Sequence, residues 1–193
     1  GGKVVAMSDS NGYIHDPQGV NWDTVRQLKE VERRRIKDYV GIHKHATYTE
    51  GCLGIWNVKC DVALPCATQN ELDEAGAKAL LKNGCIAVAE GANMPSTPEA
   101  VKLFIDHKIL YGPGKAANAG GVATSGLEMS QNSSRLMWSF EETDSKLHQI
   151  MVNIYKQASQ AAEEYGTPGN LVNGANIAGF LKVAKAMMAQ GVV

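Results

Sequence analysis

Four short apolar runs, each followed by turn residues, most constrain how this chain of 193 residues can fold. They occupy residues 4–7, 61–65, 86–89 and 109–111, and polar segments of helical character separate them. Strands that alternate with helices at this short spacing are typical of a parallel sheet with helices on both faces. The sequence therefore predicts an α/β fold.

Several polar residues are expected to start the helices of this fold. Residues 22–39 read as one polar helix, and Asn70 can cap a helix that has Asp73 at its third position. The string Ser96-Thr97-Pro98-Glu99 predicts a helix start with proline in the first turn. Ser139 with Glu142 predicts a capping box.

After residue 115 the pattern contains helices only. We therefore expect a partial dinucleotide-binding, Rossmann-like domain over residues 1–115 and a helical segment over residues 116–193. The first apolar run begins almost at Gly1, which suggests a domain cut from a longer protein. No G-x-G-x-x-G follows any of the runs, so the first strand and glycine-rich turn of a complete Rossmann domain are expected to be missing.

Composition excludes several classes of function. The formal net charge is −1 and the sequence pI is about 6.6, which gives no reason to expect nucleic acid or an anionic membrane as a partner. No apolar run approaches the roughly 18 residues of a membrane helix, and no signal peptide opens the chain, so a cytoplasmic protein with reduced cysteines is expected. His43 and His45 have no third ligand in view, and no metal site is expected.

Ligands of such folds bind beyond the carboxyl ends of the strands. Small and amide residues follow the four runs, at 8–10, 66–70, 91–93 and 114–118, and could converge on one crevice. One interpretation of Asp9 is a carboxylate that binds an adenosine ribose. An aspartate in such a string is, however, more commonly only a turn residue. The arginines at 33–35 are either a solvated helix face or a clamp for a 2′-phosphate.

The stretch KAANAGGVATSGLEMSQN, residues 115–132, is almost bare backbone where a helix is expected to start. Asn118, Val122 and Ser125 fall on one stripe of that helix, where Ser125 and free main-chain N–H groups could hold a small carboxylate. Glycines at 120 and 121 would let the ligand approach. The alternative is close packing of the helix on the sheet, with Ser125 merely solvated.

Several longer strings carry a family resemblance. PCATQNELD, EGANMP, PGKAANAGGVATSGLEMSQN, LHQIM and NGANIAGFLKVAKAMMAQGV closely resemble the C-terminal part of hexameric glutamate dehydrogenases, and the similarity covers essentially the whole chain. The resemblance implies oxidative deamination of L-glutamate to 2-oxoglutarate and ammonium, with NAD or NADP as hydride acceptor, in a homo-hexamer. It also implies that the substrate-binding lysines, the catalytic aspartate and the phosphate turn lie in an absent front half, so that this polypeptide alone is inactive and contains no catalytic residue.

The resemblance also implies roles for individual residues. Ser125 would bind the side-chain carboxylate of glutamate, and Gly121, Val122 and Asn118 would line the floor between substrate and nicotinamide. The residues expected beside the cofactor are Thr68, Gln69, Asn93 and Asn118 at the nicotinamide half and Asp9 or Ser10 near the adenosine ribose.

Two questions stay open at this point. Asp9 favours a free 2′-hydroxyl, whereas Ser8, Ser10 and the arginines could accept a 2′-phosphate. The SDS string at this strand end resembles the NADP-using members of the family, and this resemblance favours NADP over NAD. The alternatives in function are a dehydrogenase for another amino acid, such as leucine or phenylalanine, and a non-catalytic nucleotide-binding or assembly module.

Overall fold

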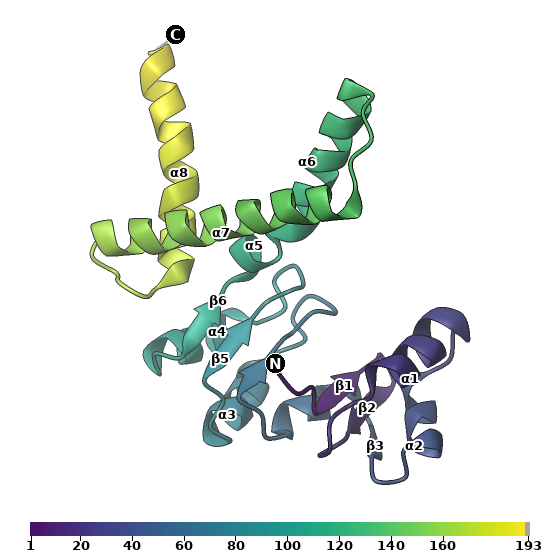
Figure 1. The fold of residues 1–193 in the computed structure, drawn as a ribbon. Helices are drawn as coiled ribbons and strands as arrows, with labels where there is room; N and C mark the ends of the chain where they lie inside the picture. Colours follow the sequence, from purple (N-terminus) through teal and green to yellow (C-terminus); the bar gives the residue numbers. More distant parts are fainter. Residues whose placement is uncertain (192–193) are drawn as a thin grey trace.

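A computed structural model describes residues 1–191, which form two three-stranded sheets and a set of long C-terminal helices (Figure 1). The first sheet has the order β1-β2-β3 and is antiparallel, with strands Ala6–Ser8, Gly12–His15 and Thr47–Glu50. The second has the order β4-β5-β6 and is parallel, with strands Val62–Ala63, Ala87–Ala89 and Leu110–Gly112.

The parallel sheet confirms the predicted α/β fold for three of the four apolar runs. Helix α3 (Glu74–Lys82) connects β4 to β5, and α4 (Pro98–Asp106) connects β5 to β6, as parallel pairing requires. The core under these helices contains Leu72, Leu80, Val88 and Phe104, each at most 1% exposed. This core holds the carboxyl ends of β4, β5 and β6 in fixed positions.

The first apolar run departs from the expectation of a strand in the parallel sheet. Strand β1 instead pairs antiparallel with β2, with Met7 opposite Ile14. The intervening residues form a tight turn, in which the Asp9 N–H donates to the Gly12 carbonyl at 2.9 Å and the Asn11 N–H donates to Asp9 Oδ1 at 3.0 Å. The chain therefore reverses immediately, and Ile14 becomes the centre of a second, smaller core.

The predicted helix 22–39 is interrupted. It divides into α1 (Trp22–Arg26), the π-helical turn Gln27–Val31, a 3₁₀ turn (Ile36–Asp38) and α2 (Tyr39–Ile42). Arg33 has a φ of 55°, in the left-handed region, and ends the first part. The Ile36 N–H then donates to Asp9 Oδ2 at 3.0 Å, so a contact with the first sheet overrides helix continuity.

Two of the three predicted helix starts are confirmed. Thr97 caps α4 through the Ala100 N–H, and Ser139 caps α7 through the Glu142 N–H at 3.1 Å. Asn70 is not a cap: it has a φ of 57°, and Asp73 accepts from the Gly76 N–H at 2.8 Å at the start of α3. The cap shifts because Leu72 is held by the Pro95 carbonyl and cannot join the helix.

The C-terminal region is helical, as predicted. It contains α5 (Gly114–Ala117), α6 (Ala119–Ser134), α7 (Phe140–Glu164) and α8 (Leu171–Gln190), and in Figure 1 α6 and α8 extend to the same side of α7. Residues 192–193 of the expected segment 116–193 lie outside the described residues, and the domain boundary at 115 stays a prediction. Within residues 1–191, no helix is both long and apolar enough to cross a membrane.

Helices α7 and α8 cross closely because Gly174 has no side chain. A Cβ at this position would overlap the carbonyl oxygen of Ala158 and press on Ala162. We expect Gly174→Ala to lower the free energy of unfolding by about 1–3 kcal/mol, since the helices must separate. Chemical denaturation followed by circular dichroism measures this change.

Gly179→Ala on the same helix is the matched control. A Cβ at Gly179 meets nothing within 4 Å, so this substitution should stabilise the helix by about 0.5–1 kcal/mol. Equal effects of the two substitutions would contradict the close crossing.

Candidate functional site

The segments that follow β4, β5 and β6 meet at the carboxyl edge of the parallel sheet, which we call the loop edge. The Gly91 N–H after β5 donates to the Pro65 carbonyl after β4 at 3.0 Å. The side-chain amide of Asn118 donates to the Ala92 carbonyl, also at 3.0 Å. Three of the four polar strand ends that the sequence indicated therefore converge, and Asn118 is fixed in place by the loop after β5.

The buried side chain of Glu90 links the loops that follow β5 and β6. Its side chain is 4% exposed, and its two oxygens accept from the Ser96 N–H at 3.2 Å and the Gly114 N–H at 2.5 Å. Burial and a hydrogen bond to Glu90 raise the pKa of Tyr111 well above its usual range, so the phenol stays protonated and donates to this carboxylate. Sequence reasoning missed Glu90; an acidic residue directly after an apolar run was the available signal.

The glycines of the site have different structural reasons. A Cβ at Gly91 would lie 2.5 Å from Cys66 Sγ, and one at Gly114 would lie 3.0 Å from Glu90 Oε2. A Cβ at Gly121 meets nothing within 4 Å, and one at Gly120 makes only ordinary contacts. Close packing therefore explains Gly91 and Gly114, but it does not explain the bare backbone at the start of α6.

Gly121, Val122 and Ser125 lie on an exposed face of α6, and Val122 is 75% exposed. The Ser125 hydroxyl donates to the Gly121 carbonyl at 3.3 Å, a bond longer than is usual for a hydroxyl donor, so the hydroxyl can rotate and donate to another acceptor instead. The expectation of free main-chain donors here is wrong for Gly121, whose N–H donates to the Asn118 carbonyl at 3.3 Å because α5 leads almost directly into α6. The Ser125 hydroxyl is the polar group that this face offers.

Thr68, Gln69 and Asn93 are exposed on the converging loops, beside the segment that carries Asn118. Asp9 and Ser10 belong to a different place, the β1–β2 turn of the antiparallel sheet. The six residues predicted to bind the cofactor thus form two groups, one at each sheet.

Asp9 is surrounded by donors and positive charge. Its Oδ2 accepts from Ile36 N and lies 3.6 Å from Lys29 Nζ and 4.0 Å from Arg35 Nη1. Burial opposes ionisation, but the N–H groups of Ile36 and Asn11 and the two cations hold the pKa of Asp9 below its usual value. Asp9 is therefore an ionised anchor of this turn.

Arg35 joins the same turn to Ser10. Its Nη1 donates to Ser10 Oγ at 2.9 Å, whereas Arg34 is engaged by Glu32 at 3.2 Å and Asp38 at 3.0 Å. Of the predicted arginine cluster, Arg35 is thus the member that lies beside the predicted ribose-binding residues.

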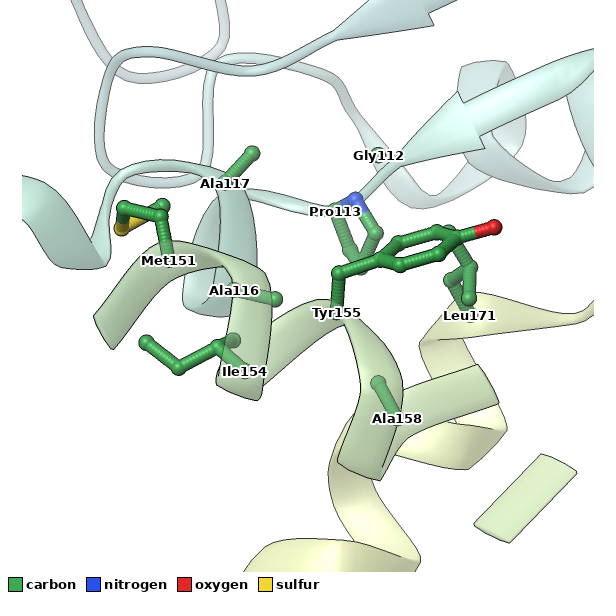
Figure 2. Close-up of a pocket in the computed structure, with 9 residues that line it drawn as sticks. All are labelled: Gly112, Pro113, Ala116, Ala117, Met151, Ile154, Tyr155, Ala158 and Leu171. Carbon is green, nitrogen blue, oxygen red and sulfur yellow. The ribbon is translucent and has the colours of Figure 1, made fainter. Parts of the chain in front are cut away.

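A partly open pocket lies between the β6–α5 connection and α7, and Figure 2 shows its lining. Its side chains are apolar apart from the Tyr155 hydroxyl, which points away from Ala116, Ala117 and Met151 (Figure 2). Because no charged group lines this pocket, it does not suit a carboxylate or a pyrophosphate. The candidate site is the loop edge and the exposed face of α6.

His43 and His45, for which the sequence indicated no third ligand, have a carboxylate beside them in the structure. The structure brings Asp16 to His43 and His45, so that one ligand atom of each lies within 4.8 Å of the others. The sequence showed no third ligand because Asp16 is far from the pair along the chain.

Comparisons with known proteins agree with this fold. The sequence profile for Glutamate/Leucine/Phenylalanine/Valine dehydrogenase matches residues 1–191. Among solved structures, glutamate dehydrogenase of Plasmodium falciparum superposes with a TM-score of 0.92 at 49% identity, over 99% of this chain and 42% of that one.

Curated relatives give the same result. A glutamate dehydrogenase of Bacteroides thetaiotaomicron is 58% identical over 196 residues. Relatives named NADP-specific, from Helicobacter pylori, and NAD-specific, from Bacteroides fragilis, are 56% and 49% identical. Each match covers 100% of this chain but only 44% of the relative.

The fold, with its loop edge beyond three parallel strands, is that of a dinucleotide-dependent dehydrogenase. The chain belongs to the glutamate/leucine/phenylalanine/valine dehydrogenase family. It spans less than half the length of the curated relatives that it matches.

The Glu90 carboxylate gives a test of the loop edge. In Glu90→Gln one acceptor oxygen becomes an NH₂ group, which leaves a buried backbone N–H without a partner. We expect the free energy of unfolding to fall by about 1–3 kcal/mol. Denaturant titration measures it, with exposed Glu163→Gln as a control that should change it by less than about 0.5 kcal/mol. Equal stability of both variants would show that Glu90 does not hold the loops.

Proposed function

We propose that this chain forms the cofactor-side part of an NAD(P)-dependent glutamate dehydrogenase, which converts L-glutamate to 2-oxoglutarate and ammonium. The observation that carries the proposal is the 49–58% identity to relatives of that name along the full length of this chain. Similarity at this level over a whole ligand-binding edge favours retention of the same substrate.

The exposed face of α6 suits the substrate side. Ser125 supplies a hydroxyl that can donate to the distal carboxylate of glutamate, and the amino end of the helix favours negative charge. Gly121 and Val122 add no charge and, at Gly121, no side-chain bulk. An open, neutral floor of this kind lets substrate and a redox ring approach closely, as hydride transfer requires.

The loop edge offers groups that suit the nicotinamide half of the cofactor. Thr68, Gln69 and Asn93 offer exposed hydroxyl and amide groups, and Asn118 is held in place by Ala92. NAD(P), when bound, supplies the hydride acceptor. Strands β1 and β4 are both edges of their sheets within residues 1–191, so each can accept a further strand from the remaining part of a full-length relative.

Cofactor choice is proposed from the Asp9 turn. Arg35 and Ser10 place two donors together, which favours a 2′-phosphate, and Asp9 is neutralised by Lys29 and Arg35. We therefore favour NADP, with NAD as the alternative. Relatives carry names for both specificities, so the family alone does not decide.

The alternatives are weaker. Leucine and phenylalanine dehydrogenases share the family profile, but their substrates need apolar walls where Ser125 presents a hydroxyl. A non-catalytic nucleotide-binding or assembly module would not need an open Gly121 next to that hydroxyl. A homo-hexamer and a cytoplasmic location are part of the proposal by likeness to the glutamate dehydrogenases.

Ser125→Ala tests the substrate role in the full-length enzyme. Loss of a hydrogen bond to a charged group costs about 1.5–3 kcal/mol, so the Michaelis constant for glutamate should rise roughly tenfold or more. Ser130→Ala is the matched control, because Ser130 makes the same bond to a carbonyl four residues back, at 2.9 Å, on the same helix. An unchanged Michaelis constant in Ser125→Ala would remove the proposed carboxylate contact.

Arg35→Ala tests the cofactor role separately. If Arg35 contacts a 2′-phosphate, the Michaelis constant for NADP should rise roughly tenfold or more while that for NAD stays the same. Arg34→Ala, which removes an arginine already paired with two carboxylates, should leave both constants unchanged. An equal effect of Arg35→Ala on both cofactors would argue against a 2′-phosphate site.

A further inference from the structure

A carboxylate and two imidazoles gather at one end of the antiparallel sheet, away from the loop edge. Asp16 directly follows β2, His43 ends α2, and His45 lies in the turn that leads into β3. Figure 1 shows these three elements side by side. One potential ligand atom from each residue lies within 4.8 Å of the other two.

Asp16 is fixed before any ligand arrives. Its side chain is fully buried, and Oδ1 accepts from the Gln18 N–H at 2.9 Å. Oδ2 accepts from the Tyr39 hydroxyl at 2.9 Å, and that hydroxyl accepts in turn from the Asn21 N–H at 2.8 Å. A buried carboxylate oriented in this way resembles a metal ligand that is supported by outer hydrogen bonds.

His45 faces the same oxygen. Its Nε2 lies 3.0 Å from Asp16 Oδ2, and its side chain is 37% exposed. The two atoms are spaced so that they can share a proton or bind one cation, because metal bonds of about 2.0–2.2 Å set neighbouring ligand atoms roughly 3–3.5 Å apart.

His43 is held from two sides. Its ring stacks on Tyr39 at 4.4 Å between centroids, and its Nε2 lies 2.9 Å from Thr24 Oγ1. The Thr24 hydroxyl donates to Asn21 Oδ1, so it accepts from Nε2–H of His43. The lone pair of the neutral ring is then on Nδ1, and the other nitrogen is held by an outer partner, as in metal-binding histidines.

We propose that Asp16, His43 and His45 form a binding site for a divalent transition-metal cation of the Zn²⁺ type. Two imidazoles and one carboxylate suit zinc, cobalt or nickel and not magnesium or calcium, which prefer oxygen ligands throughout. Three protein ligands leave a coordination position for water. Because His45 is exposed on a short turn, its side chain can rotate to close the remaining gap while Asp16 and His43 stay in place.

The simpler reading is that Asp16 and His45 form only a structural hydrogen bond. The two readings differ in one measurable property, stoichiometric affinity for a metal ion. The test is therefore isothermal titration of the purified, untagged protein with ZnCl₂.

We expect one Zn²⁺ per chain, with affinity reduced at least roughly tenfold in His43→Ala and in His45→Ala. These histidines are partly exposed, so the variants should remain folded, which circular dichroism verifies. His148→Ala removes an exposed histidine elsewhere and should bind as the parent does. Tyr39→Phe, which removes the hydroxyl that orients Asp16, should weaken binding by roughly tenfold.

Co²⁺ identifies the ligand type. Nitrogen and oxygen ligands give weak visible bands alone, whereas binding to Cys60 or Cys85 would add an intense thiolate-to-metal band in the near ultraviolet. No stoichiometric Zn²⁺ binding, binding unchanged in both histidine variants, or a thiolate band would each overturn the proposal.

Discussion

The Glu90 carboxylate is the contact on which the arrangement of the loops at the carboxyl edge of the parallel sheet depends. It is buried at the end of the central parallel strand and accepts backbone N–H groups from the loops that follow β5 and β6. A buried charge is tolerated only when it is fully hydrogen-bonded, so loop geometry and charge burial stabilise each other. Through Gly114 and the helix that starts there, this contact also sets where Asn118 and α6 begin.

The sequence predicted the features that depend on local chemistry. The three parallel strands, the Thr97 and Ser139 caps, and the gathering of polar strand ends follow from short-range patterns and from the rule that parallel strands end at one edge. Features set by distant contacts were missed. The antiparallel pairing of β1 depends on a four-residue strand with little pattern, and the break at Arg33 depends on Asp9 capturing the Ile36 N–H.

The site residues divide in the same way. Exposed residues such as Thr68 and Ser125 were singled out because they are small polar side chains at a strand end and a helix start and because the family resemblance implies roles for them. Glu90 and Asp16 were missed because an acidic residue next to an apolar run, which is the signal at Glu90, does not by itself distinguish a buried carboxylate from a solvated one. Both turned out to be the groups that orient their neighbours, and the binding roles of the exposed residues stay predictions.

The unpaired flanks of β1 and β4 have a consequence for handling the polypeptide. Each presents backbone donors and acceptors without a strand partner in the described part of the chain. Such flanks are templates for strand addition, and neighbouring molecules compete to fill them at high concentration. Molecules in which these flanks stay uncovered are therefore expected to self-associate more readily than molecules in which further strands cover them.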